Sequence, residues 1–333
     1  MKIQLGHSFN DIINVDNLLE AWHEFNKDKR KRKDVQEFDF HLMDNVLTLH
    51  NDLSRLVYKH GGYYAFTISD PKPRHIHKAL VRDRLLHHGI HRILYPFFDK
   101  TFIADSFSCR ISKGTHKALN RFRDFSCQVS HNHAKTCWVL KCDVKKFFAN
   151  IDHRILLGIL SEYIPDTQIM WLLERVIASF SSSRAGVGLP IGNLISQLFC
   201  NIYMNEFDQF IKHKLRSKYY IRYADDFVLL SENREWLHQQ IPKISEFLEN
   251  RLKLTLHPDK VSIKTLASGV DFLGWVHFTN HRVLRTTTKK RMMRRIQEHP
   301  TEETLQSYLG LLKHGNTYGL QEEIIKFDSR HWL

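Results

Sequence analysis

Apolar residues recur at steps of three and four between residues 35 and 56, which is the spacing of one buried helix face. This stripe consists of Val35, Phe38, Leu42, Val46, Leu49, Leu53 and Leu56. It predicts one long helix that ends at Gly61 and Gly62, because paired glycines commonly terminate helices. Residues 16–60 are therefore expected to be helical, within an N-terminal helical extension covering residues 1–62.

Short apolar runs and helical patterns alternate through the rest of the chain. Strands are predicted at 63–69, 139–144, 219–223, 227–231, 253–256, 261–264 and 270–278, with a turn at 70–73. Helices are predicted at 83–105, 152–163, 168–182, 193–215 and 234–252, and the tail from 286 is helical and basic. Since strands and helices follow no regular β-α-β order, an α+β fold with helices on one face of the sheet fits best.

The charge balance points to a polyanionic partner. Lys and Arg number 49 against 36 Asp and Glu, a formal net charge of +13, which favours nucleic acid over an anionic membrane surface. No stretch approaches the roughly 18 apolar residues of a membrane span, and residues 1–10 lack the pattern of a secretory signal. We expect a cytoplasmic protein without membrane contact. The basic run at 27–33 is either a solvated helix end or a contact for RNA or an accessory protein.

The five cysteines are an odd number without paired spacing, which favours reduced thiols. His131, His133, Cys137 and Cys142 could be considered as zinc ligands. Their spacing differs from that of standard zinc fingers, and Cys142 falls inside a predicted strand. An ordinary loop and buried thiols are therefore the preferred interpretation.

Two adjacent carboxylates, Asp225 and Asp226, stand between two predicted strands. Adjacent carboxylates repel each other and resist burial, so a divalent cation would stabilise them. A tight turn at 224–226 would mount both for Mg²⁺ binding and phosphoryl transfer. Asp143 ends another predicted strand, and two-metal phosphoryl transfer takes carboxylates from separate strands. Asp143 and Asp225 are the candidate pair.

Residues 223–226, Tyr-Ala-Asp-Asp, resemble the Tyr-x-Asp-Asp motif of reverse transcriptases. From about residue 63 to 320 the chain resembles, block by block, the reverse transcriptases of bacterial retroelements. The similar blocks lie at 74–88, 106–119, 143–153, 188–204, 223–227, 256–260 and 272–275. This resemblance implies a right-hand polymerase fold, with fingers and palm at 63–284 and a helical thumb at 285–333.

The resemblance also assigns roles. It implies that Asp143, Asp225 and the Val144 carbonyl hold two Mg²⁺ ions, for which Mn²⁺ can substitute, with Asp226 as the paired acid. Lys260 matches the lysine expected to protonate pyrophosphate, or is simply solvated. The residues expected to bind the incoming deoxynucleotide are Lys72, Arg74, Val144, Lys145, Lys146, Phe147, Phe148 and Ile191.

Within that set, Phe148 matches the steric gate that excludes a ribose 2′-hydroxyl, with core packing as the alternative. Lys72 and Arg74 could instead be ordinary turn charges. The primer grip is expected at Phe272, Leu273, Gly274 and Trp275, where Phe272 and Trp275 could also only pack. Phosphate contacts from the thumb are expected at Arg291, Arg294 and Arg295.

The stretch 189–197, Leu-Pro-Ile-Gly-Asn-Leu-Ile-Ser-Gln, departs from most retroelement enzymes. Ile191 replaces a glutamine expected beside the nascent base pair, and Gln197 replaces a proline. Losing the amide removes hydrogen-bonding capacity, and a loss of about 3 kcal/mol of discrimination would raise errors roughly a hundredfold. Ile191 is therefore the candidate fidelity residue.

This stretch resembles the reverse transcriptases of diversity-generating retroelements. That resemblance implies cDNA synthesis with errors at adenines, a structured template RNA, an RNA/DNA duplex and a pentameric accessory variability protein as partners. The alternatives are a retron-type enzyme, whose Val-Thr-Gly triplet we do not find, a group II intron-like enzyme, which should keep Pro-Gln-Gly and extend past the thumb, and a defence-associated enzyme. A non-catalytic RNA-binding scaffold is the alternative outside the enzymes, disfavoured by the intact aspartates and Lys260.

Overall fold

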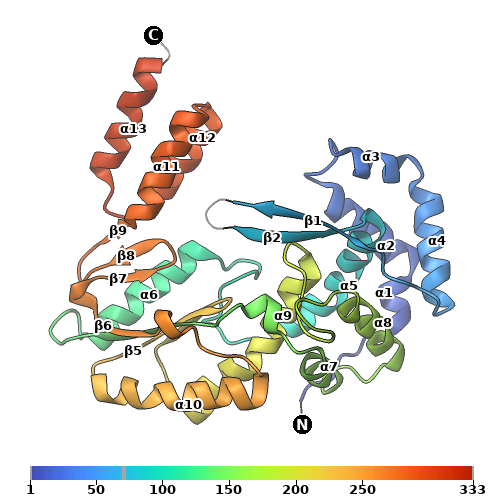
Figure 1. The fold of residues 1–333 in the computed structure, drawn as a ribbon, viewed down its shortest axis with the longest axis horizontal. Helices are drawn as coiled ribbons and strands as arrows, with labels where there is room; N and C mark the ends of the chain where they lie inside the picture. Colours follow the sequence, from blue (N-terminus) through green and yellow to red (C-terminus); the bar gives the residue numbers. More distant parts are fainter. Residues whose placement is uncertain (1, 70–72, 332–333) are drawn as a thin grey trace.

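The computed structural model describes residues 2–69 and 73–331 of the chain. Its ribbon shows N-terminal helices on one side, antiparallel strands with their covering helices on the other, and C-terminal helices that rise above the strands (Figure 1). Within the described ranges, no helix has the length and apolar character needed to cross a membrane.

The N-terminal region contains α1 (Phe9–Ile13), α2 (Val15–Asn26), α3 (Lys33–Phe40) and α4 (Leu42–Ser54). The prediction of one long helix is wrong, because the chain leaves helical geometry at His41, where φ is −115° and ψ is 34°. The step of four from Phe38 to Leu42 continues across this break, so the periodicity could not reveal it. The break allows α3 to pack against α5 (Val81–Asp99) while α4 packs against α1 and α2.

Strands β1 (Tyr63–Ile68) and β2 (Arg74–Ala79) form a separate antiparallel hairpin. It confirms the strand predicted at 63–69, while most of the predicted turn lies outside the described residues, as does Lys72. Most β1 side chains are exposed, and the hairpin projects from the N-terminal helices over the middle of the molecule (Figure 1).

The central sheet has the strand order β4-β5-β3-β6, and all neighbouring strands are antiparallel. Its members are β3 (Trp138–Asp143), β4 (Tyr220–Tyr223), β5 (Asp226–Ser231) and β6 (Ser262–Thr265). The predicted strand at 253–256 is reduced to one bridge between Leu256 and Val144. Lys253, with φ 52°, ends α10 (Arg234–Leu252) and redirects the chain before a strand can form.

Both faces of this sheet are buried, as expected for a strand with a continuous apolar run. In β5, Phe227 and Leu229 join the core with α9 (Leu194–Gln209) and α10. Val228 and Leu230 point the other way, into a second core. That second core includes α6 (Thr115–Val129), a helix that was not predicted, although Ala118, Phe122, Phe125 and Val129 recur at steps of three and four. The predicted α+β class is confirmed, with α6 as an addition on the second face.

Helices α7 (His153–Ser161) and α8 (Thr167–Ala178) pack together beside α9. The helices predicted at 152–163, 168–182, 193–215 and 234–252 are thus confirmed as α7 to α10, and the one predicted at 83–105 ends earlier, as α5. A π-helical segment, Phe210–Lys214, extends α9.

The chain continues into a three-stranded sheet and then helices. Strands β7 (Val270–Phe272), β8 (Trp275–His277) and β9 (Arg282–Leu284) precede α11 (Thr286–Glu298), α12 (Glu302–Leu312) and α13 (Tyr318–His331). The hairpin strand predicted at 270–278 comprises both β7 and β8, which turn at Leu273 and Gly274, where φ is positive at 50° and 86°. Such pairs form tight two-residue turns. Trp275 anchors the third core, and a Cβ on Gly315 would lie 2.0 Å from its ring.

Candidate active site

Asp225 and Asp226 lie where β4 turns into β5. Tyr223 pairs with Asp226, so the turn consists of Ala224 and Asp225, and Asp226 already belongs to β5. This corrects the turn predicted at 224–226 by one residue. Ala224 has φ 56°, a left-handed conformation that is uncommon for a residue with a side chain. The surrounding structure must therefore hold this turn in place.

A buried ion pair provides that support. Arg222 Nε and Nη2 each donate to a carboxylate oxygen of Asp208 at 2.7 Å, and neither side chain is exposed. Arg222 Nη1 donates to the Ala224 carbonyl at 3.1 Å, which ties the guanidinium to the strained residue. Neither Arg222 nor Asp208 was predicted as a site residue. The available signal was an arginine inside an otherwise apolar strand, since buried arginines are rare unless paired.

Asp143 ends β3 and lies directly opposite Asp226 in the strand register. Lys260 Nζ donates to Asp143 Oδ1 at 2.8 Å. Lys141, two residues before Asp143 and so on the same face, places its Nζ 3.7 Å from Asp226 Oδ2. The structure brings the predicted catalytic residues together and adds Lys141, which the pattern of charged residues within strand 139–144 could have indicated.

Burial dominates the electrostatics of the two turn carboxylates. It raises the pKa of Asp226 to about 7, with Asp143 and Asp225 adding to the increase and Lys141 opposing it. Burial and then Asp143 also raise the pKa of Asp225, whereas Lys260 and Arg74 lower it. Arg74, at the start of β2, is therefore close enough to act on the charge of Asp225 despite its distance in sequence.

The carboxylates suit an open cation site. Asp226 Oδ1 is buried and has no hydrogen-bond partner among the residues that the structure describes. Within residues 2–69 and 73–331, no three His, Cys, Asp or Glu side chains are grouped as a complete metal cage. Mg²⁺ is usually held by one or two carboxylates together with substrate phosphates. Asp143 and Asp225 therefore fit a site that a nucleotide completes.

The segment after β3 runs beside these acids. Val144 is buried, and its amide donates to the Asp225 carbonyl at 3.2 Å. Lys145 and Lys146 are exposed, and Lys146 has φ 46°. Phe147 belongs to the core, so its side chain packs there, and the expectation that its backbone lines the triphosphate stays a prediction. Phe148 is only partly buried against that core, which leaves part of its ring available to a ligand.

Ile191 lies where the β1–β2 hairpin meets the loop at 188–193. His77 N donates to the Ile191 carbonyl at 3.0 Å, and Asn193 Nδ2 donates to the His77 carbonyl at 2.8 Å. Leu189 N donates to the Phe148 carbonyl at 2.8 Å. These bonds bring Ile191, Phe148 and the Arg74 strand into one neighbourhood, as the nucleotide-binding prediction requires.

Glycine is required at position 192. Gly192 has φ +103°, and a Cβ there would lie 2.7 Å from Ile76 Cγ2 of β2. Ala or any larger residue would strain the backbone and push the hairpin away from the loop. Gly192 of the Pro-Ile-Gly-Asn motif therefore allows β2 to pack closely against the loop at 188–193.

The other predicted residues lie on separate elements. Phe272 and Trp275 are buried in two different cores, so both pack, while Leu273 and Gly274 form the turn between them. Arg285 N donates to the Gly274 carbonyl at 3.0 Å, which links this turn to the start of α11. On α11, Arg294 and Arg295 are exposed and Arg291 is half-buried.

Cys137 and Cys142 belong to cores on opposite faces of the central sheet. Burial raises the pKa of both thiols, that of Cys137 to about 12. His131 and His133 lie on the exposed loop before β3. Two cysteines on opposite faces do not converge on one ion, so the structure separates the four residues considered for zinc.

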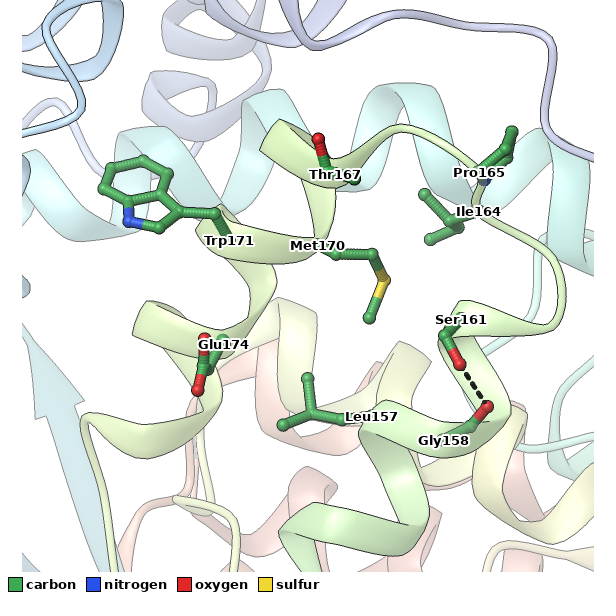
Figure 2. A pocket seen from close by; sticks show the side chains of 9 residues that line it. All are labelled: Leu157, Gly158, Ser161, Ile164, Pro165, Thr167, Met170, Trp171 and Glu174. Atoms are coloured by element: carbon green, nitrogen blue, oxygen red, sulfur yellow. Dashed lines mark hydrogen bonds between the residues drawn. The ribbon is translucent and has the colours of Figure 1, made fainter.

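A surface hollow between α7 and α8 is lined by none of the predicted catalytic residues. Figure 2 shows its lining, which includes Met170 and Trp171 and has Glu174 as its single charged side chain. With no cationic group in its wall, this hollow offers nothing to the phosphates of a nucleotide.

The fold and the opposed carboxylates are those of a template-directed polymerase. Residues 68–277 match the family described as "Reverse transcriptase (RNA-dependent DNA polymerase)". The match covers more than half of the chain, so the chain belongs to the reverse transcriptase family of RNA-directed DNA polymerases, which are nucleotidyltransferases.

Two curated relatives support this membership. Protein YkfC of Escherichia coli is 27% identical over 276 residues, which cover 71% of this chain and 69% of that protein. The group II intron-encoded protein LtrA of Lactococcus lactis is 23% identical over 279 residues, which cover 63% of this chain and 44% of LtrA. The chain thus spans less than half of LtrA.

A solved structure confirms the fold. Apo telomerase of Candida tropicalis, truncated from the C-terminal domain, superposes with a TM-score of 0.51 over 74% of this chain and 60% of that chain. Sequence identity is 13%, so this likeness supports the polymerase fold alone.

Proposed function

We propose that this chain copies RNA into DNA at the site formed by Asp143, Asp225 and Asp226. The observation that carries this proposal is the register of the central sheet, in which Asp143 faces Asp226 beside the Ala224–Asp225 turn. The division into extension, fingers with palm, and thumb at residues 62 and 284 belongs to the same proposal. The partners are a template RNA, the RNA/DNA duplex and deoxynucleotides.

Asp143 and Asp225 would hold two Mg²⁺ ions, with the Val144 carbonyl as a further ligand and Asp226 as the paired acid. When bound, such ions lower the pKa of a primer 3′-hydroxyl and neutralise triphosphate charge. Lys260, which contacts Asp143 at 2.8 Å, supplies the proton for pyrophosphate. Arg74 would draw the triphosphate toward Asp225, and Phe148 would exclude a 2′-hydroxyl from the sugar position.

Primer extension tests this activity. Purified protein with Mg²⁺, deoxynucleotides and an RNA template with a DNA primer should extend the primer, and Asp225→Ala should abolish extension. Asp124→Ala, which changes an acid that is 49% exposed on α6, should keep wild-type activity. Absence of synthesis by the wild type, or full synthesis by Asp225→Ala, would refute the proposal.

Within this function, the proposed subclass is the error-prone reverse transcriptase of a diversity-generating retroelement. Support comes from Ile191 and Gln197 in the motif and from the placement of Ile191 beside the Phe148 segment. An apolar side chain there cannot hydrogen-bond to a base pair or sugar, which fits relaxed discrimination at template adenines. A structured template RNA and a pentameric accessory variability protein are the partners of this hypothesis.

A group II intron-like enzyme is the second candidate, and the similarity to LtrA favours it. The two candidates differ at residue 191. Ile191→Gln should lower misincorporation opposite template adenine, whereas the conservative Ile191→Val should leave the error spectrum unchanged. Equal adenine errors in cDNA from wild type and Ile191→Gln would count against the mutagenic subclass and leave the intron-like candidate.

A further inference from the structure

A hollow of about 700 Å³ lies where α6, the β8–β9 connection and the α12–α13 loop meet. We call it the basic pocket; its wall consists of residues 277–282 and 313–316, together with Asn120, Phe122, Arg123, Ser126, Cys127, His133 and Leu266. Its volume falls within the range of ligand-binding pockets. Because it lies at the far end of β8 from the turn at Leu273 and Gly274, it is distinct from the catalytic carboxylates, none of which lines it.

Cationic groups line this pocket, and no described residue of its wall carries a carboxylate. Arg123, Arg282 and Lys313 all belong to its wall. Burial, and then the charge of Arg123, lowers the pKa of Arg282. The pKa of His314 is lowered by burial, by His116 and by Arg282. The wall is therefore a site of mutual cationic repulsion, which an anion would relieve.

Two buried polar atoms of the wall are unpaired. Arg282 donates to the His314 carbonyl and to Asn120 Oδ1, but its Nη1 is buried without a partner. His277 is only 3% exposed, and its Nε2 also has no partner. Burial lowers the pKa of His277 to about 3, so the ring is neutral; its other nitrogen donates to the Phe272 carbonyl, which leaves Nε2 as a hydrogen-bond acceptor. Buried polar atoms in folded proteins rarely stay unpaired, so a ligand with both an acceptor and a donor would complement this wall.

Aromatic rings complete the pocket. Phe278 and His281 stack on each other, with ring centroids 4.9 Å apart and planes 15° from parallel. Stacked aromatic surfaces beside cationic side chains are the recurrent platform for unpaired bases. A recess walled by three segments admits one splayed nucleotide, whereas the side of a duplex requires an open groove.

We propose that the basic pocket binds an unpaired nucleotide of an RNA strand outside the catalytic site. Arg123, Arg282 and Lys313 would contact its phosphate, and Phe278 with His281 would stack on its base. The ribose 2′-hydroxyl, absent from DNA, is the donor for His277 Nε2. This inference rests on the proposed function, because an enzyme that copies RNA must hold a template strand longer than the few nucleotides at its active site.

The test uses the full chain with its catalytic cleft already occupied. The protein is saturated with an unlabelled RNA/DNA primer–template, and a fluorescein-labelled single-stranded RNA of roughly ten nucleotides is titrated by fluorescence anisotropy. The Arg123→Glu, Lys313→Glu double variant should bind this RNA at least tenfold more weakly, because the two substitutions reverse the charge at the pocket. Both side chains are exposed, so the fold should tolerate the change. DNA of the same sequence should bind wild type more weakly than RNA.

A matched control reverses two exposed charges on another helix. Lys243→Glu, Arg251→Glu on α10 changes the net charge by the same amount and should leave the affinity within about twofold. Equal losses in both double variants, or no loss in the pocket variant, would overturn the site, and equal RNA and DNA affinity would overturn the choice of RNA.

Primer extension on a short template should be unchanged in the pocket variant. Failure of extension in the wild type would instead refute the proposed function, so the two failures are distinguishable.

Discussion

The β4–β5 turn and the β1–β2 hairpin bring candidate catalytic groups to one place, but they are held very differently. The turn rests on a fully buried guanidinium that bonds to Asp208, Asn201, Ser106 and the Ala224 carbonyl. The hairpin is mostly exposed and is attached through a few contacts, chiefly His77 with the 188–193 loop and Tyr63 with Ser179.

This difference separates two requirements of a polymerase. Carboxylates that must keep a fixed mutual geometry need surrounding hydrogen bonds that hold them in a single position. A hairpin that contacts an incoming nucleotide must admit and release it at each cycle, and such elements are drawn from the least stable parts of a protein. Substitutions at the turn should therefore change global stability, and substitutions at the hairpin should change nucleotide binding or local opening.

The largest effect is expected at the buried ion pair. Arg222→Met leaves the Asp208 carboxylate buried without its counter-charge, with the Tyr220 hydroxyl as a remaining donor, which should lower the free energy of unfolding by about 3–5 kcal/mol. Urea denaturation measures this change. The double variant Arg222→Met, Asp208→Leu removes the unpaired charge and should recover part of that stability, because the buried Tyr220 hydroxyl then loses its acceptor. Primer extension should not recover, because the Ala224 carbonyl stays unsupported. A wild-type urea midpoint for Arg222→Met would contradict a structural role for the pair.

The second-largest effect is expected for Gly192→Ala, because it strains the contact between β2 and the loop at 188–193 rather than the central sheet. A non-glycine residue at φ +103° with its Cβ 2.7 Å from Ile76 Cγ2 should cost about 1–3 kcal/mol. We expect this cost mainly as a raised KM for deoxynucleotides. Gly158→Ala is the matched control, since Gly158 lies in α7 with open space around its Cβ position. An unchanged KM in Gly192→Ala would show that the hairpin does not need this contact.

Much of the fold and of the candidate site could be predicted from the sequence, but not the packing that holds the turn and the hairpin differently. Alternating and continuous apolar runs predicted β1, β3, β4 and β5, and the motifs predicted the meeting of Asp143 with Asp225. The break at His41 keeps the helical step, so it was invisible to periodicity. The pairing of Arg222 with Asp208 depends on how β4 packs against α9, which no local pattern encodes. The helix α6 was not predicted, although Ala118, Phe122, Phe125 and Val129 recur at helical steps among its polar residues.

Arg74→Gln should act on the hairpin without disturbing its fold. Arg74 is exposed, and its charge reaches Asp225, so its loss should raise the KM for deoxynucleotides about tenfold, or about 1.4 kcal/mol. The urea midpoint should not change. Arg55→Gln, an exposed arginine at the end of α4, is the control and should leave KM unchanged. An equal rise of KM in both variants would show that the effect comes from general charge attraction and not from the position of Arg74.

The smallest effect is expected at the base of the hairpin. Ser179 Oγ donates to the Val176 carbonyl at 2.6 Å, so it accepts the hydrogen bond from Tyr63 Oη at 2.7 Å. Tyr63→Phe removes that bond together with the longer contact between Tyr63 Oη and His60 Nε2 at 3.4 Å, which should lower the free energy of hairpin opening by about 0.5–1.5 kcal/mol. Hydrogen exchange of the β1 and β2 amides should accelerate accordingly, while exchange in β3 and β5 stays at the wild-type rate. Tyr64→Phe is the matched control, because Tyr64 is the next residue of β1 and is 69% exposed. If both variants accelerated exchange equally, or if β5 accelerated with the hairpin, the two regions would open as one unit and the contrast between them would be lost.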